Sequence, residues 1–219
     1  MSGIQSWFEY LSSRWDLVVA TTLETLGYVV VVTVSAALVS IAIGVATRRN
    51  AFTRELSLSV ASVFLTVPSL ALFTIFIPIV GLGFWPSSIA LFLYAILPIL
   101  RNTVTGLQSV DASVVESARG MGMTRSQILL GVELPLAWPI ILAGVRVSAM
   151  LTVGVSAIAT LVAGGGIGDF IKSGLARLPL PNSLEAIWTG VILSLVLAFA
   201  IDTAMRGVGR VTTSAGVRS

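Results

Sequence analysis

The feature that most limits what this chain can fold into is an uncharged run that extends from Leu56 to Leu100. A bilayer core about 30 Å thick is crossed by a helix of about 20 apolar residues, so this run is long enough for two crossings. Only 11% of the chain is charged and 56% is hydrophobic, whereas soluble domains carry about 25% charged residues. We therefore expect an all-α polytopic membrane protein embedded in a lipid bilayer.

Breaks in the apolar pattern divide the chain into about five transmembrane helices. Gly81, Gly83 and Pro86 predict a tight turn that splits the uncharged run into two helices. The expected spans are residues 25–47, 56–80, 85–105, 136–163 and 185–205. We assign residues 21–206 to one transmembrane domain and residues 207–219 to a polar cytoplasmic tail.

Residues 1–20 precede the first expected span. Trp7, Leu11, Trp15 and Val18 recur near helical spacing, which favours an amphipathic helix at the outer interface with its indoles at headgroup depth. An irregular leader is the alternative.

The distribution of basic residues predicts how the chain crosses the membrane. With five spans, the two termini lie on opposite sides. If the C-terminus is cytoplasmic, the only basic residues outside, of 13 in the chain, are Arg14, Lys172 and Arg177. The positive-inside rule therefore predicts an extracytoplasmic N-terminus and a cytoplasmic segment at residues 107–135.

Two residue types that carry much of enzyme chemistry are missing from the sequence. The chain contains no cysteine and no histidine, which excludes thiol nucleophiles, disulfides, Cys/His metal sites and histidine-dependent triads. The glycine-rich run from Gly164 to Gly168 lacks the Lys-Ser/Thr of a phosphate-binding loop. We therefore expect no enzyme activity, no bound cofactor, no metal and no nucleic-acid partner for this chain.

The cytoplasmic segment has the pattern of two short helices. Ser113 and Glu116 fit a capping box, and Asp111 ahead of them adds negative charge that the helix dipole favours. The first helix is expected to run to about Met121, with Gly122 in the left-handed conformation that ends it.

The second short helix is expected to begin after Thr124, because Thr124 and Gln127 repeat the capping-box spacing. On the first helix Val114, Val115, Ala118 and Met121 form an apolar stripe beside Glu116 and Arg119. Such a stripe can be buried against another protein or against lipid headgroups, and the pattern alone leaves both open.

A spaced motif runs through this segment. Glu116-Ser117-Ala118 is followed after three residues by Gly122, and after nine more by Val132-Glu133-Leu134-Pro135. This motif resembles the EAA loop of binding-protein-dependent ABC importer permeases. The family pattern is E-A-A, three residues, G, nine residues, then I-x-L-P. Ser117 and Val132 depart from it by small changes in volume, and the spacing is intact.

The resemblance implies a type I ABC importer permease of a bacterial cytoplasmic membrane. In that family the loop docks on separate ATPase subunits, and ATP-driven closure rocks two permeases between inward-facing and outward-facing states. A second permease copy or a paralogue is therefore implied. By carry-over, the ATPase-coupling residues are Glu116, Ser117, Ala118, Arg119, Gly122, Leu134 and Pro135.

Three further stretches, residues 65–72, 97–103 and 164–171, resemble permeases of osmoprotectant importers. These importers carry glycine betaine, choline, carnitine or proline. Some relatives carry a fused substrate-binding domain, but the sequence ends 14 residues after Met205, so we expect a separate extracytoplasmic binding protein. The alternatives are a permease for methionine or another amino acid, an ion-coupled secondary transporter and, least favoured, an intramembrane enzyme.

The residues that contact the cargo are harder to predict from the sequence. Quaternary ammonium groups are recognised by aromatic rings, although aromatic residues in membrane helices commonly serve packing. Candidates for the translocation path are Phe64, Pro68, Phe73, Tyr94 and Arg146. For Arg146, a charge within a span, structural anchoring is favoured over substrate contact. An outer gate is expected at Gly164, Gly165, Gly166, Gly168 and Asp169.

Overall fold

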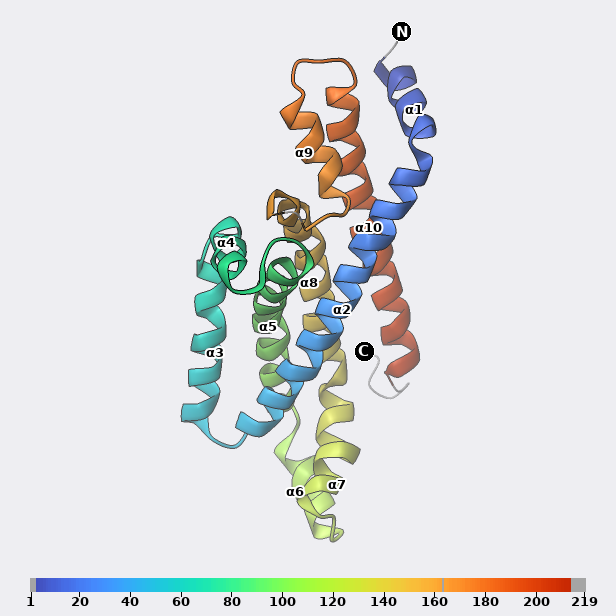
Figure 1. Cartoon of the computed structure of the whole chain (residues 1–219). Helices are drawn as coiled ribbons and strands as arrows, with labels where there is room; N and C mark the ends of the chain where they lie inside the picture. The colour runs from blue at the N-terminus through green and yellow to red at the C-terminus, as the bar shows by residue number, and fades with distance from the viewer. Residues whose placement is uncertain (1–2, 163, 214–219) are drawn as a thin grey trace.

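The computed structural model describes residues 3–162 and 164–213. The chain is helical in these ranges and contains no strand there (Figure 1). Its helices are α1 (Gly3–Ser13), α2 (Trp15–Thr47), α3 (Ala51–Thr66), α4 (Ser69–Val80), α5 (Phe84–Gln108), α6 (Ala112–Gly120), α7 (Arg125–Ile128), α8 (Leu134–Ala159), α9 (Gly168–Ala176) and α10 (Ser183–Thr212). A π-helical turn (Leu129–Glu133) joins α7 to α8, and a 3-10 turn (Thr160–Val162) follows α8.

The all-α membrane fold expected from the sequence is confirmed. Within the described residues, four helical segments are long and apolar enough to cross a bilayer, and they cover Trp15–Thr47, Phe84–Gln108, Arg125–Val162 and Ser183–Thr212. The pair α3 and α4 makes a fifth crossing if it is counted as one bent span.

The second expected span, residues 56–80, is not one continuous helix. α3 ends at Thr66, Val67 is extended, and α4 begins at Ser69 with its axis turned by 97°. Pro68 explains the break, because its ring disfavours a helical conformation at the preceding residue and it has no N–H to donate. The Tyr94 hydroxyl donates a hydrogen bond to the Val67 carbonyl that the break leaves open.

The ends of the chain also differ from the expected boundaries. α2 begins at Trp15, so Trp15 and Val18 belong to this long helix and not to a separate interfacial one. α1 packs on α10, and the Trp7 indole donates to the Thr189 hydroxyl at 3.0 Å. α10 continues to Thr212, so residues 207–212 are helical. Residues 214–219 of the expected tail lie outside the described residues, as do residues 1–2.

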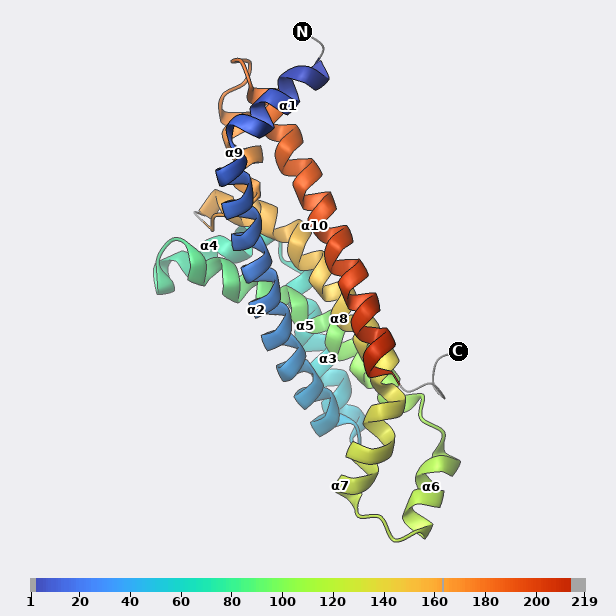
Figure 2. The same cartoon turned by 90° about the vertical axis from the view of Figure 1, so that its right-hand side faces the viewer.

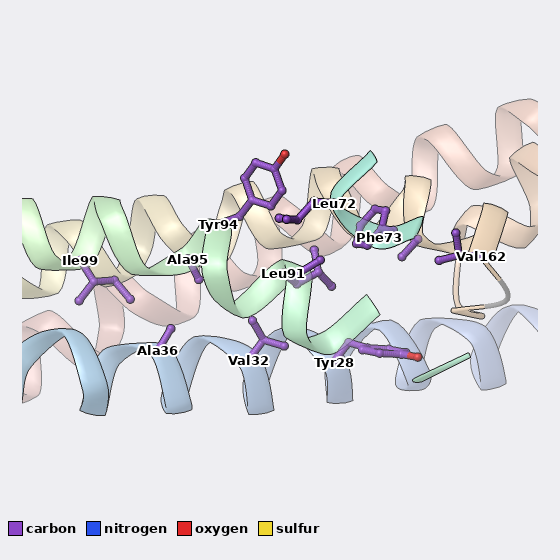
Figure 3. Close-up of a cluster of buried hydrophobic side chains, with 12 residues drawn as sticks. Tyr28, Val32, Ala36, Leu72, Phe73, Leu91, Tyr94, Ala95, Ile99 and Val162 are labelled. Carbon is purple, nitrogen blue, oxygen red and sulfur yellow. The ribbon is translucent and has the colours of Figure 1, made fainter. Parts of the chain in front are cut away.

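The core lies between α2, α4, α5 and α8. Figure 3 shows Tyr28, Val32 and Ala36 of α2 facing Leu91, Ala95 and Ile99 of α5, with Leu72 and Phe73 of α4 close by. α5 packs most extensively on α8, where small residues allow the helices to approach closely. A Cβ on Gly106 would lie 2.9 Å from the Ala137 carbonyl oxygen.

The molecule is elongated, and its two ends differ. α6 and α7 form one end, while α1 and α9 lie at the other (Figure 1). α4 runs across the long axis and projects from the side of the bundle (Figure 2). α2, α5 and α8 therefore run lengthwise between the α6–α7 end and the opposite end.

Candidate functional site

The N-cap of α6 lies two residues earlier than the sequence pattern predicts. Asp111 is the N-cap residue, and its Oδ1 accepts a hydrogen bond from the Ser113 backbone N–H at 2.8 Å. The predicted Ser113–Glu116 box is therefore wrong, because the carboxylate of Asp111 already caps the helix and places Ser113 inside it. The hydrogen bonds from Ser113 hold the pKa of Asp111 below its ordinary value.

The glycine turn after α6 has the predicted geometry. Gly122 has φ +81°, its N–H donates to the Arg119 carbonyl, and the Met123 N–H donates to the Ala118 carbonyl. This pair of bonds is a Schellman motif, which satisfies the last carbonyls of the helix.

The second predicted cap is also present. The Thr124 backbone N–H donates to Gln127 Oε1 at 2.7 Å, and the Gln127 N–H donates to Thr124 Oγ1 at 3.4 Å. These reciprocal bonds form a capping box that starts α7. Helices α6 and α7, the glycine turn between them and the π-helical turn after α7 are called the coupling segment below, after the role that the resemblance of the sequence implies. The glycine turn is held by local hydrogen bonds at both of its ends.

The coupling segment exposes a mixed apolar and charged face. Glu116, Ser117 and Arg119 are exposed, and Met121 is 76% exposed. Ala118 differs from the rest of the predicted apolar stripe, because it is buried where α6 contacts α7 and the π-helical turn. Val114 of α6 and Leu130 of the π-helical turn are further exposed apolar residues of the segment.

An ion pair links the coupling segment to the end of α2. Arg48 Nε lies 3.2 Å from Glu133 Oε2, and the two side chains are 17% and 19% exposed. Glu133 ends the π-helical turn, and Leu134 and Pro135 begin α8 directly after it. Pro135 cannot donate the hydrogen bond of a regular helix, which favours the wider turn before it. Sequence reasoning missed this pair, since its members lie far apart along the chain.

The predicted gate residues lie at the start of α9 and just before it, on the side of the core away from α6 and α7 (Figure 1). Three side chains of α2 bind the glycine-rich turn: the Tyr28 hydroxyl donates to the Gly164 carbonyl at 2.5 Å, Glu24 Oε2 accepts from the Gly166 N–H at 3.0 Å, and Thr25 Oγ1 accepts from the Ile167 N–H at 2.8 Å. The roles of these three α2 side chains were not predicted.

The glycines of this turn are required by its geometry. Gly165 and Gly166 have φ of +72° and +87°, a region that side chains rarely adopt. A Cβ on Gly166 would lie 2.5 Å from Thr25 Oγ1, and one on Gly168 would overlap the Ala157 carbonyl oxygen. Asp169 lies in the first turn of α9 and remains exposed.

The candidate path residues differ in burial and in contacts. Phe73 is fully buried in the core, and Tyr94 uses its hydroxyl to bind the Val67 carbonyl at the break between α3 and α4. Pro68 is exposed at that same break, and Phe64 is half-buried on α3. In this conformation Phe73 packs in the core and Tyr94 binds the backbone at the break. Of these four residues, only Pro68 is exposed.

Arg146 is paired with a carboxylate that sequence reasoning overlooked. Its Nε bonds Asp202 Oδ1, and Asp202 Oδ2 also accepts from Arg206 Nη2 at 2.5 Å. Asp202 is 7% exposed at its side chain, so a buried carboxylate on α10 is held between two arginines. This arrangement ties α8 to α10 and agrees with the anchoring interpretation of Arg146. Among residues 3–162 and 164–213, no group of three or more acidic side chains is placed to hold a metal ion.

Similarity to known proteins extends over most of the chain. The family model for the binding-protein-dependent transport system inner membrane component matches residues 37–212. The choline transport system permease protein OpuBB of Bacillus subtilis (strain 168) is 35% identical over 210 residues, covering 96% of this chain and 95% of that protein. The osmoprotectant import permease protein OsmW of Salmonella typhimurium is 32% identical, covering 95% and 98%.

The carnitine transport permease protein OpuCB of Listeria monocytogenes is 41% identical over 174 residues, covering 78% of this chain and 80% of that protein. Among solved structures, a chain of the inward-facing MetNI methionine ABC transporter superposes with a TM-score of 0.79 at 23% identity. The superposition covers 92% of this chain and 99% of that one, which shows the shared fold.

Proposed function

Because this chain belongs to the inner-membrane components of binding-protein-dependent transport systems, we propose that it is the permease of an ABC importer for an osmoprotectant. The cargo is glycine betaine, choline, carnitine, proline or a close analogue. Relatives that cover most of the chain are named as permeases for choline, carnitine and osmoprotectants, and these names support this choice of cargo.

The coupling segment is the observation that carries the proposal. Its α6 and α7 end the molecule, its turn is fixed by Gly122, and its exposed face combines Met121 with the charges of Glu116 and Arg119. An exposed apolar group beside charges suits a protein partner that closes over it. We assign this face to a separate ATPase subunit, which hydrolyses ATP while this chain binds no cofactor.

The coupling segment is also placed to pass motion into the membrane. It continues through the π-helical turn into α8 without a loop, and Glu133 binds Arg48 at the end of α2. A displacement of α6 and α7 by the ATPase therefore reaches two spanning helices at once. Both helices lead to the glycine-rich turn, where α2 binds Gly164 and Gly166.

This function requires a defined orientation and further partners. The α6–α7 end faces the cytoplasm and the end with α1 and α9 faces outward, as the excess of arginine near α6 and α7 favours. An extracytoplasmic binding protein delivers cargo to the outer end, and a second permease copy or paralogue completes the path. The glycine-rich turn with Gly168 and Asp169 acts as the outer gate.

Uptake of radiolabelled substrates tests the cargo. Cells that lack this chain and all redundant osmoprotectant uptake are complemented with wild-type protein at high osmolarity. Restored uptake of glycine betaine, choline, carnitine or proline supports the proposal. Uptake of methionine alone, or no restored uptake of any of the four compounds, would assign the permease to a different cargo.

A further inference from the structure

A hollow lies beside the glycine-rich turn, between α2 and the start of α5. It has a volume of about 330 Å³ and is lined by Glu24, Gly27, Tyr28 and Val31 of α2, Phe84 of α5, and Gly164. This volume lies at the small end of ligand pockets, which span about 300–1,000 Å³. The hollow therefore has room for a small organic cation or zwitterion but not for a large cargo.

Aromatic rings form one side of the hollow. The Phe84 ring lies 4.8 Å from the Tyr28 ring, centroid to centroid, and Trp85 packs edge-on against Phe84 at 5.4 Å. Phe84 is 44% exposed, so neighbouring side chains leave part of this residue free to contact a ligand. Figure 3 shows Tyr28 lying at the end of the core, along α2 and toward Val162. Ring faces of this kind attract cations, and quaternary ammonium groups in particular.

A fixed carboxylate borders the same hollow. Glu24 Oε2 accepts from the Gly166 N–H, which holds the carboxylate on the side of α2 that faces the hollow. The Tyr28 hydroxyl is likewise held by the Gly164 carbonyl. The six lining residues include one carboxylate and no lysine or arginine. The hollow therefore offers a preorganised anion beside aromatic faces, which favours a cationic group over an anion.

We propose that this hollow is a transit site for the trimethylammonium head of the cargo at the outer mouth of the permease. The inference rests on the proposed osmoprotectant function and names the part of the substrate that this chain contacts. The exposed Phe84 ring contacts the methyl groups, the buried Tyr28 ring packs behind it, and Glu24 attracts the positive charge. Since Tyr28 and Glu24 also hold the glycine-rich turn, a cation in the hollow lies directly against the outer gate.

The charge of Glu24 predicts a difference between substrates. Choline carries only a positive charge, whereas glycine betaine also carries a carboxylate, which Glu24 repels. Neutralising the carboxylate in Glu24→Gln therefore lowers choline transport more than glycine betaine transport. Removing the ring in Phe84→Leu weakens the contact with the methyl groups of both substrates.

Binding of tetramethylammonium is the first test, because it does not require transport. The assembled transporter in nanodiscs is studied by saturation-transfer NMR on the methyl protons of tetramethylammonium. We expect Glu24→Gln and Phe84→Leu each to weaken binding by about two- to five-fold, the range of an exposed charge pair and of a cation–ring contact, respectively. Phe84→Tyr keeps a ring and retains binding, which separates ring loss from misfolding.

The controls make matched changes away from the hollow. Asp16→Asn removes an exposed carboxylate from the same helix, and Phe199→Leu removes an exposed ring from α10. Both controls bind tetramethylammonium like wild type. Unchanged binding in Glu24→Gln and Phe84→Leu, or no saturation transfer to the wild-type transporter, would overturn the transit site.

Transport in proteoliposomes with the cognate binding protein is the second test. The choline-to-glycine betaine rate ratio falls in Glu24→Gln and stays at the wild-type value in Asp16→Asn. A merely destabilised variant lowers both rates together and leaves the ratio unchanged, and that result would contradict the inference. If the wild-type transporter moves no osmoprotectant, the proposed function fails, and the tetramethylammonium measurement still decides whether the hollow binds such a cation.

Discussion

At the residue scale, Gly122 is the position where backbone conformation matters most for coupling. Its φ of +81° disfavours any side chain, although a Cβ would meet nothing within 4 Å. Gly122→Ala therefore strains the turn by about 1–2 kcal/mol without a steric clash, and we expect lower substrate-stimulated ATPase activity. Gly120→Ala is the matched control, since Gly120 is helical and equally open. Equal activity of the two variants would remove the turn from the coupling mechanism.

Gly168 illustrates the opposite case, a glycine required by close approach. A Cβ there would overlap the Ala157 carbonyl oxygen, whereas one on Gly154 would meet nothing within 4 Å. Overpacking of this kind costs about 1–3 kcal/mol. We expect Gly168→Ala to lower the Tm of the purified protein by several degrees, at about 2–4 °C per kcal/mol, and Gly154→Ala to leave it unchanged. A Tm for Gly168→Ala equal to that of Gly154→Ala would show that the turn adapts freely.

At the scale of elements, the Arg48–Glu133 pair joins α2 to the start of α8. A double-mutant cycle on unfolding free energy, with Arg48→Gln and Glu133→Gln, is expected to give a coupling of about 1 kcal/mol, because both side chains are mostly buried. Arg54 and Glu55 supply a control pair, since Glu55 is 69% exposed at its side chain and exposed pairs contribute little. A coupling for Arg48–Glu133 no larger than for the control pair would contradict this link.

Local chemistry also explains which elements the sequence could predict. The capping box at Thr124 and the turn at Gly122 depend on neighbours within a few residues, so their patterns were sufficient. The break at Pro68 was missed because a proline in a span can bend a helix or end it. Here the hydroxyl of Tyr94, on α5, donates a hydrogen bond to the Val67 carbonyl at the break.

At the scale of the whole molecule, the apolar runs were enough to predict the spans but not the contacts between them. The partner of Glu24 lies in the glycine-rich turn and that of Arg146 lies on α10, more than fifty residues away in each case. No local pattern marks such pairs, because they arise only when the helices pack. The sequence alone therefore did not predict the proposed site at the outer end, because this site depends on the contact between α2 and the glycine-rich turn.

The proposed orientation is open to a direct test, since the chain has no cysteine. Single substitutions Arg125→Cys and Asn182→Cys place thiols at the two ends of the molecule, at the first residue of α7 and just before α10. In intact cells a membrane-impermeant thiol reagent is expected to label Asn182→Cys, and to label Arg125→Cys only after permeabilisation. The reverse pattern would invert the orientation and place the coupling segment outside the cell.

ATP-driven transport by the reconstituted complex tests the central claim most directly. Proteoliposomes contain this permease, its ATPase and the cognate binding protein, and labelled glycine betaine, choline and carnitine are supplied on the binding-protein side. The account predicts accumulation of at least one of them that requires ATP at the α6–α7 side and is lost in Gly122→Glu. Accumulation that follows an imposed ion gradient without ATP, or that persists in Gly122→Glu, would contradict it.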